Sequence, residues 1–289
     1  MAKCALCMKE KELMQSHIIP KFIGKWLKET SATGYLRQAV NPNKRQQDLG
    51  KIELLCHECE EKFSSYEKNF AENIFTPFQN GQKEFHYDEW LVKFIISINW
   101  RVAVTESGEN RSNMPEHLLK ELDIAIEAWR KFLNDECTNR GGYTHHMFFL
   151  DTIQSVSSGM EVLDHTNWYL LRTVDGTTAY SSEVVFVYSK LPGVIIVSHI
   201  QPENMKGWSR TRVSNKGNLK IPQAISVEGF GDFLNHRIRE TNRLTSEMSE
   251  LQRQKIGQNV KNDLEKLHNS KSFEAIQADL FLKGINSED

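Results

Sequence analysis

The sequence predicts an α+β protein, in which a small cysteine-containing N-terminal unit precedes a region of helices and an antiparallel sheet. Three observations support this prediction. Two Cys-x-x-Cys pairs lie before residue 60. Apolar residues then recur at helical spacing between residues 88 and 133, and β-formers with turn signals between them fill the stretch from Met147 to Ile200. Helices and strands segregated along the chain in this way are typical of an α+β fold.

Charge and hydropathy predict a cytoplasmic protein without a membrane segment. The 289 residues include 36 Lys and Arg and 38 Asp and Glu, for a formal net charge of −2. No apolar run approaches the ~18–20 residues that cross a bilayer, and the longest candidate, Phe94 to Val104, is interrupted by Arg101. No apolar signal region follows Lys3 and Cys4, so export is not expected. Thiols stay reduced in the cytoplasm, where paired cysteines indicate metal more often than a disulfide.

Residues 1–80 are expected to form the first of two domains. Local patterns predict a helix around Phe22–Leu27, a polar loop at Ser31–Gly50, a strand at Ile52–Leu55 and a helix at Glu60–Ile74. Pro77 and Gly81 then mark the end of this domain.

Residues 81–289 are expected to form a second domain, whose role is sensing, partner binding or nucleic-acid binding. Its predicted helices are a stretch from Asp88 with Trp90, Phe94, Ile95, Ile98 and Val102 on one face, Met114–Leu133, a long stretch from about Val227 to Leu267, and a shorter one that ends near Leu282. Its predicted strands are Met147–Leu150, Trp168–Val174, Ser182–Tyr188 and Val194–His199. The clearest turn signals between them are Asp175-Gly176 and Pro192-Gly193.

Four of the five cysteines form the two pairs, Cys4 with Cys7 and Cys56 with Cys59. Two thiolates three positions apart can face one ion at a turn, and two such turns complete the tetrahedral sulfur set that zinc prefers. A reduced thiol cluster without metal and an iron–sulfur cluster use the same residues and stay open as alternatives. A four-cysteine zinc site has no position for substrate or water. This zinc is therefore expected to stabilise the fold, and a reactive ion would bind elsewhere.

The motifs around these cysteines follow a defined order. Cys4-x-x-Cys7 is followed by Ser16-His17-Ile18-Ile19-Pro20 and then by Leu54-Leu55-Cys56-x-x-Cys59. Over the N-terminal part of the chain, this order resembles the HNH endonucleases that carry a zinc knuckle, of the ββα-metal or treble-clef type. The resemblance implies such a fold for residues 1–80. It also implies hydrolysis of a phosphodiester bond with the help of one divalent ion, Mg²⁺ or Mn²⁺.

The resemblance also implies roles for individual residues. His17 matches the general base, a role that suits an imidazole because its pKa of about 6.5 in free form lies near working pH. Glu60 stands where the family places its last His and would bind the divalent ion, with Asp48 as a second oxygen ligand and His57 as a candidate nitrogen ligand. The sequence departs from the family at Ser16, where a carboxylate or His is usual, and in lacking the Asn before the second cysteine pair. A structural histidine beside apolar residues is the alternative for His17.

Basic residues gather in two stretches. Residues 18–51 hold seven basic and two acidic residues, with Lys44 and Arg45 as candidate phosphate contacts. Residues 206–220 hold five basic residues and no acid, with Arg210 and Arg212 as candidates. An exposed hairpin tip with solvated charges is the alternative for the second stretch. The dipeptide His145-His146 lacks companion ligands at metal-binding spacing and is expected to be a surface pair.

Two hypotheses on function follow from these residues. The first is a metal-dependent HNH-type endonuclease that cuts DNA, which is favoured over RNA, as an effector of a bacterial anti-phage defence system. The second is a catalytically inactive zinc-binding module that binds nucleic acid or a protein partner, and Ser16 and the missing Asn favour it. The Arg-bearing stretch from Val227 is expected to be a solvated face or a helix that docks a partner or a second copy of the chain.

Overall fold

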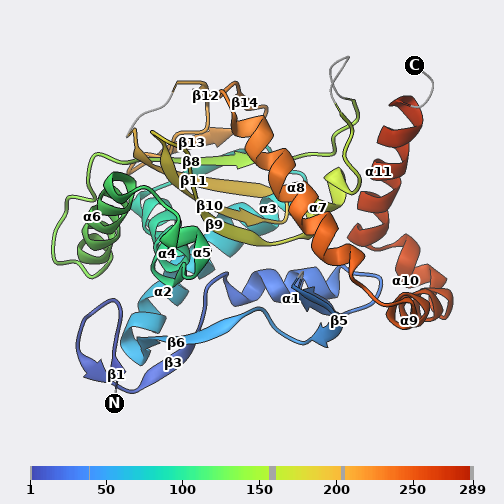
Figure 1. Cartoon of the computed structure of the whole chain (residues 1–289), viewed down its shortest axis with the longest axis horizontal. Coiled ribbons are helices and arrows are strands. Elements are labelled where there is room, and N and C mark those ends of the chain that lie inside the picture. The colour runs from blue at the N-terminus through green and yellow to red at the C-terminus, as the bar shows by residue number, and fades with distance from the viewer. Residues whose placement is uncertain (1, 39, 156–160, 203–205, 287–289) are drawn as a thin grey trace.

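The computed structural model describes residues 2–38, 40–155, 161–202 and 206–286, and a four-stranded antiparallel sheet lies at its centre (Figure 1). The protein is 46% helix and 23% strand, which confirms the predicted α+β class. The strands lie in the order β8 (Thr144–Phe149), β11 (Val194–Gln201), β10 (Val185–Leu191) and β9 (Asp175–Tyr180). All neighbouring strands of this sheet are antiparallel, as predicted.

Helices cover both faces of this sheet. α4 (Glu89–Thr105) and α6 (Glu116–Leu133) pack in one hydrophobic cluster with Met147, Val187 and Ile196. α8 (Phe230–Ser246) crosses the opposite face, where Phe230 and Phe186 belong to a second cluster (Figure 1). Because both faces are covered, all seven residues of β10 are buried.

The N-terminal unit is built around an antiparallel pair of strands with a long connection and the helix that follows it. β3 (Leu13–His17) pairs with β6 (Lys51–Cys56) to form the β3–β6 hairpin, and α2 (His57–Phe70) continues directly from β6. α1 (Lys21–Glu29) follows β3. The short paired strands β1 (Ala2–Lys3) and β2 (Glu10–Lys11) precede β3. These bounds confirm the predicted helix around Phe22–Leu27 and the predicted strand at Ile52–Leu55.

One hydrophobic cluster joins the N-terminal unit to the helices of the central sheet. The predicted apolar face of α2 is buried, and its Phe70 stacks on Phe94 of α4 with ring centroids 4.0 Å apart. α2 runs on through the π-helical turn η1 (Ala71–Phe75) into α3 (Thr76–Gln79). This cluster contains residues from both sides of residue 80. The division into domains 1–80 and 81–289 stays a prediction.

The basic stretch at 206–220 is not a single hairpin tip. Its first strand, β12 (Trp208–Ser209), pairs with β14 (Ala224–Ile225). Its second, β13 (Gly217–Lys220), pairs with β7 (Glu84–Tyr87), more than 100 residues earlier in the chain.

The short helix α5 (Glu109–Ser112) follows α4. Among the residues described, no helix combines the length and apolar character needed to cross a membrane.

The predicted strand at Trp168–Val174 is wrong, because this segment forms the helix α7 (Thr166–Arg172). The backbone N–H groups of Asn167 and Trp168 donate to the two carboxylate oxygens of Asp279, at 2.7 and 3.0 Å. Unsatisfied N–H groups at a helix start need such an acceptor. Here the acceptor comes from a helix more than 100 residues later, so local residue preference does not reveal it. The predicted turn at Asp175-Gly176 is also wrong, since both residues lie in β9.

The predicted loop at Ser31–Gly50 contains a second hairpin. β4 (Leu36–Gln38) pairs with β5 (Asn41–Gln46). Polar residues dominate both strands, so neither shows the alternation of apolar residues that would predict a strand. Contacts with the C-terminal helices hold the hairpin instead: Asn43 Oδ1 accepts the N–H of Ser249 at 2.8 Å, and Asn43 Nδ2 donates to the carbonyl of Glu247.

The long helix predicted from Val227 to Leu267 is divided into three. α8 is followed by α9 (Glu250–Lys261) and α10 (Leu264–His268), and α11 (Lys271–Asn286) closes the chain. Ser249 and Asp263 cause the breaks, because the side chain of each accepts a backbone N–H of the helix that begins after it. Both residues are good N-caps, a signal that the sequence does carry.

The turn at Pro192-Gly193 confirms the prediction and depends on glycine. Gly193 has φ +74°, and a Cβ there would lie 2.8 Å from Cε1 of Phe78. We expect Gly193→Ala to lower the free energy of unfolding by about 1–2 kcal/mol. Gly257 of α9 is the matched control, since a Cβ there meets open space. Gly257→Ala should raise the free energy by about 0.5–1 kcal/mol through helix propensity. Urea unfolding curves measure both, and equal signs for the two variants would contradict this account.

Candidate functional site

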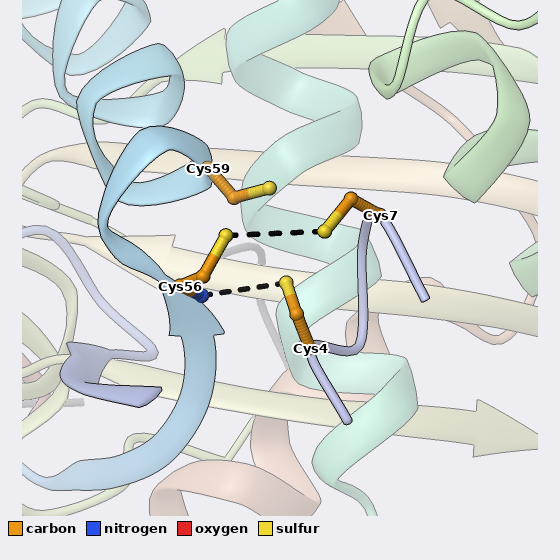
Figure 2. Close-up of side chains that lie close together, drawn as sticks. All are labelled: Cys4, Cys7, Cys56 and Cys59. Atoms are coloured by element: carbon orange, nitrogen blue, oxygen red, sulfur yellow. Dashed lines mark hydrogen bonds between the residues drawn. The ribbon is translucent and has the colours of Figure 1, made fainter. Parts of the chain in front are cut away.

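The four paired cysteines lie together at one end of the β3–β6 hairpin (Figure 2). Cys4 and Cys7 come from the loop between β1 and β2, Cys56 ends β6, and Cys59 lies in the first turn of α2. All four Sγ atoms lie within 4.8 Å of one another, and those of Cys7 and Cys56 are 3.8 Å apart. Zn–S bonds of about 2.3 Å in a tetrahedron place sulfur atoms about 3.8 Å apart. The four cysteines could therefore bind a metal ion such as zinc.

Backbone hydrogen bonds lower the pKa of Cys4, whereas burial raises the pKa of Cys56 and Cys59. The N–H of Cys56 donates to Sγ of Cys4 at 3.3 Å. Burial alone would raise the pKa of Cys4. The hydrogen bond from Cys56 and further backbone hydrogen bonds outweigh burial and lower this pKa to about 7. Burial raises the pKa of Cys56 to about 11. A metal ion would displace the remaining protons, so its affinity would fall as the pH falls.

His17 and Asp48, both predicted site residues, lie together at the other end of the same hairpin. His17 is the last residue of β3, where it pairs with Lys51 of β6. Its buried Nε2 lies 3.1 Å from Oδ1 of Asp48, a close contact off the direction of a hydrogen bond. Oδ2 of Asp48 is 2.6 Å from Nζ of Lys51. Burial alone would raise the pKa of Asp48, but its contacts with Lys51 and His17 outweigh that effect and lower the pKa to about 2. Asp48 is therefore ionised at neutral pH and faces the imidazole.

Glu60 lies in the first turn of α2 and differs from Asp48 in its surroundings. Its Oε1 is buried and has no hydrogen-bond partner in the structure. Within the described part of the chain, the four cysteines are the one group of three or more His, Cys, Asp or Glu side chains placed closely enough to hold a metal ion. His17, Asp48 and Glu60 thus do not form a comparable cluster. His57, the candidate nitrogen ligand, is exposed and lies 3.8 Å from Glu61.

The predicted nucleic-acid contacts lie in two separate places. Lys44 and Arg45 belong to β5 in the N-terminal unit, and the guanidinium of Arg45 lies 4.5 Å from the ring centroid of Tyr35. Arg210 and Arg212 are exposed and follow β12. β5 and β12 lie at opposite sides of the molecule, with the central sheet between them (Figure 1). The structure therefore does not bring the two pairs into one surface.

The expected surface pair His145-His146 is buried. Both residues lie in β8, with 1% and 2% of their surface exposed. Nδ1 of His145 lies 2.8 Å from Oγ of Ser198, and Nδ1 of His146 lies 3.0 Å from Oγ1 of Thr211. Since β8 is covered on both faces, adjacent side chains that point in opposite directions are both enclosed. These histidines therefore belong to the interior.

Sequence reasoning missed the residues that surround His17. Lys51 forms an ion pair with Asp48, and Nη1 of Arg101 in α4 donates a hydrogen bond to the backbone carbonyl of His17. The interruption of an apolar run by Arg101 was the one signal of this contact in the sequence.

No protein-family model, curated protein or solved structure matches this chain.

Proposed function

We propose that this chain is a metal-dependent endonuclease of the HNH type that hydrolyses DNA phosphodiester bonds, with His17 as its general base. The observation that carries the proposal is the contact between Nε2 of His17 and Oδ1 of Asp48, 3.1 Å apart at the end of the β3–β6 hairpin. The order β3, β6, α2, with four cysteines that converge at the start of α2, supports the proposed ββα-metal, treble-clef assignment.

The His17–Asp48 contact suits proton transfer. The negative charge of a carboxylate 3.1 Å from Nε2 favours the tautomer with the proton on that nitrogen. Nδ1 is then the base that takes a proton from the attacking water, and Asp48 stabilises the imidazolium that results. Both oxygens of Asp48 already face a partner, His17 or Lys51. Its role in the proposal is therefore to orient His17, in place of the metal-ligand role that the motif suggested.

The proposed enzyme would use two metal ions, one structural and one catalytic, at different places. Cys4, Cys7, Cys56 and Cys59 would hold zinc as a structural ion. Glu60 follows Cys59 at the cysteine end of the strand pair, whereas His17 and Asp48 lie at the other end. Its buried Oε1 has no hydrogen-bond partner, so Glu60 is the proposed ligand of Mg²⁺ or Mn²⁺, which commonly binds through one or two carboxylates together with substrate phosphates. When bound, that ion stabilises negative charge on the phosphate. Lys44 and Arg45, shortly before Asp48 in the chain, would contact the DNA backbone.

Cleavage of a supercoiled plasmid tests this proposal. With Mg²⁺ or Mn²⁺ we expect the wild type to nick or linearise the plasmid. His17→Ala should lower the rate by about 10²- to 10⁴-fold, the usual contribution of a general base. His236→Ala, at an exposed histidine of α8, should leave the rate unchanged. Cleavage by His17→Ala at the wild-type rate would remove His17 from the role of base.

A zinc-binding module without catalysis is the second candidate. It is favoured by the lack of a three-ligand cluster of His17, Asp48 and Glu60 among the described residues. This candidate requires DNA binding that weakens steeply with salt, as phosphate contacts do, and no cleavage with any divalent ion by the wild type. Fluorescence anisotropy with labelled duplex DNA at several salt concentrations, alongside the plasmid assay, separates the two candidates.

A further inference from the structure

We propose that Arg101 is a positioning residue for His17, which it fixes by tying the end of β3 to α2 and α4. The proposal rests on the proposed function, since it concerns the same site. Arg101 is the one charged residue among the buried residues of α4, a helix that the structure describes in full. It is 1% exposed and lies in the middle of an apolar stretch.

The guanidinium of Arg101 contacts three elements at once. Nη1 donates to the backbone carbonyl of His17 at 2.7 Å, and Nε donates to the carbonyl of Ser97, one turn earlier in α4. Nη2 lies 2.7 Å from Oε1 of Glu67 in α2, a close ion-pair contact off the direction of the N–H bonds. Its Cζ lies 5.3 Å from the ring centroid of Phe63, also in α2. One side chain therefore fixes the backbone of His17 relative to two packed helices.

Stability alone does not account for this arginine. Burying a guanidinium and a carboxylate costs several kcal/mol per ion, and replacing such a pair by packed apolar residues is often neutral or stabilising. The ring of Phe63, whose centroid lies 5.3 Å from Cζ, offers a surface against which an apolar side chain could also pack. What an apolar residue cannot supply is a directed hydrogen bond to the carbonyl of His17. That bond lies at the last pair of the β3–β6 ladder.

Arg172 of α7 supplies a matched control. It is also buried, at 7% exposed, and also donates to a backbone carbonyl of the N-terminal unit, that of Leu27, at 3.0 Å. Its guanidinium lies over Trp26, and Nη1 donates to Thr30 just after α1. The two arginines thus make similar contacts to the same unit, but the contacts of Arg172 involve α1 and not His17.

The experiment compares Arg101→Met, Arg172→Met and Glu67→Gln with the wild type. Plasmid cleavage with Mn²⁺ gives kcat and KM, metal analysis gives the zinc content, and ¹⁵N NMR of the histidine rings reports the tautomer of His17. Because a misplacement near 1 Å costs up to about 100-fold in rate, we expect Arg101→Met to lower kcat about 10- to 100-fold with little change in KM. Its His17 ring should lose the preference for a single tautomer. Arg172→Met should keep kcat within about twofold of the wild type and keep the His17 tautomer.

Two outcomes would overturn the proposal. The first is wild-type kcat in a folded, zinc-bound Arg101→Met protein, and the second is an equal loss of kcat in Arg101→Met and Arg172→Met. If Arg101→Met does not fold, Glu67→Gln decides, since it removes the charge partner and leaves the arginine in place: a lower kcat supports positioning and wild-type kcat overturns it. If the wild type does not cleave, the proposed function fails. The NMR comparison then still tests positioning, because an unchanged His17 tautomer in the Arg101→Met protein, or in Glu67→Gln, would overturn it.

Discussion

Cys59→Ser is expected to lose the metal ion and several kcal/mol of stability, the largest effect of any single change considered for this protein. Cys59 is 5% exposed and would join the first turn of α2 to the loop between β1 and β2 through a shared metal ion. Structural zinc sites contribute folding free energy directly, with apparent binding free energies of about 10–16 kcal/mol in small zinc domains. A loss of even 3–5 kcal/mol corresponds to a melting temperature roughly 10 °C lower. Metal analysis and thermal unfolding monitored by circular dichroism measure both effects.

The fifth cysteine provides the control for this prediction. Cys137 lies outside the four-cysteine group, and its Sγ donates to the carbonyl of Asn139 at 3.0 Å. Cys137→Ser should keep the metal content and lower stability by no more than about 1 kcal/mol. A strong chelator should shift the wild type, and not Cys59→Ser, toward lower melting temperature. Wild-type protein that contains no metal and melts at the same temperature with chelator would contradict the prediction.

Features that depend on neighbours in sequence could be predicted. The spacing of Phe63, Tyr66, Phe70 and Ile74 predicted the buried face of α2 and the turn η1 that continues it, and all four residues are buried. The two Cys-x-x-Cys pairs predicted that the four thiols lie together, because two thiols from each of two turns complete one tetrahedral metal site. Both are local patterns, for which the periodicity of the chain carries the information.

Features that depend on distant residues could not be predicted in this way. Residues Trp168–Val174 are rich in β-formers, yet the carboxylate of Asp279 accepts two N–H groups at the start of α7 and stabilises a helix there. The hairpin of β4 and β5 depends on Asn43 contacts with residues about 200 positions later. In each case a tertiary hydrogen bond outweighs a weak local preference.

The candidate site shows the same division between local and distant information. His17 could be selected from its motif, but its partners come from three other segments: Asp48 precedes β6, Arg101 lies in α4 and Glu67 lies in α2. Asp48 was expected to bind the divalent ion. Its contact with His17 Nε2 depends on the register of β3 against β6, which the sequence pattern does not define.

A second charged group, the partly buried Asp175, links the central sheet to α7 and α8. It lies at the start of β9 and receives three hydrogen bonds from other elements. Nε and Nη2 of Arg237 in α8 donate to it at 2.8 and 2.7 Å, and the hydroxyl of Tyr169 in α7 donates at 2.8 Å. The hydroxyl of Tyr188 in β10 lies 3.0 Å from that of Tyr169. Burial raises the pKa of both tyrosines, so both stay neutral, and Tyr169 uses this carboxylate as its acceptor.

Asp175→Ala is therefore expected to lower the free energy of unfolding by about 2–4 kcal/mol, because the partly buried guanidinium of Arg237 and the hydroxyl of Tyr169 both lose their acceptor. The free energy should be recovered in part by Arg237→Met in the same chain, because the second change removes the unpaired guanidinium. Asp123→Ala is the control, since Asp123 forms an exposed pair with Arg111 that is worth at most about 1 kcal/mol. Urea unfolding monitored by tryptophan fluorescence measures the three variants. If Asp175→Ala and Arg237→Met have additive effects in the double variant, the two side chains do not stabilise α8 as a pair, and apolar contacts such as that of Phe230 with Phe186 alone hold the helix on the sheet.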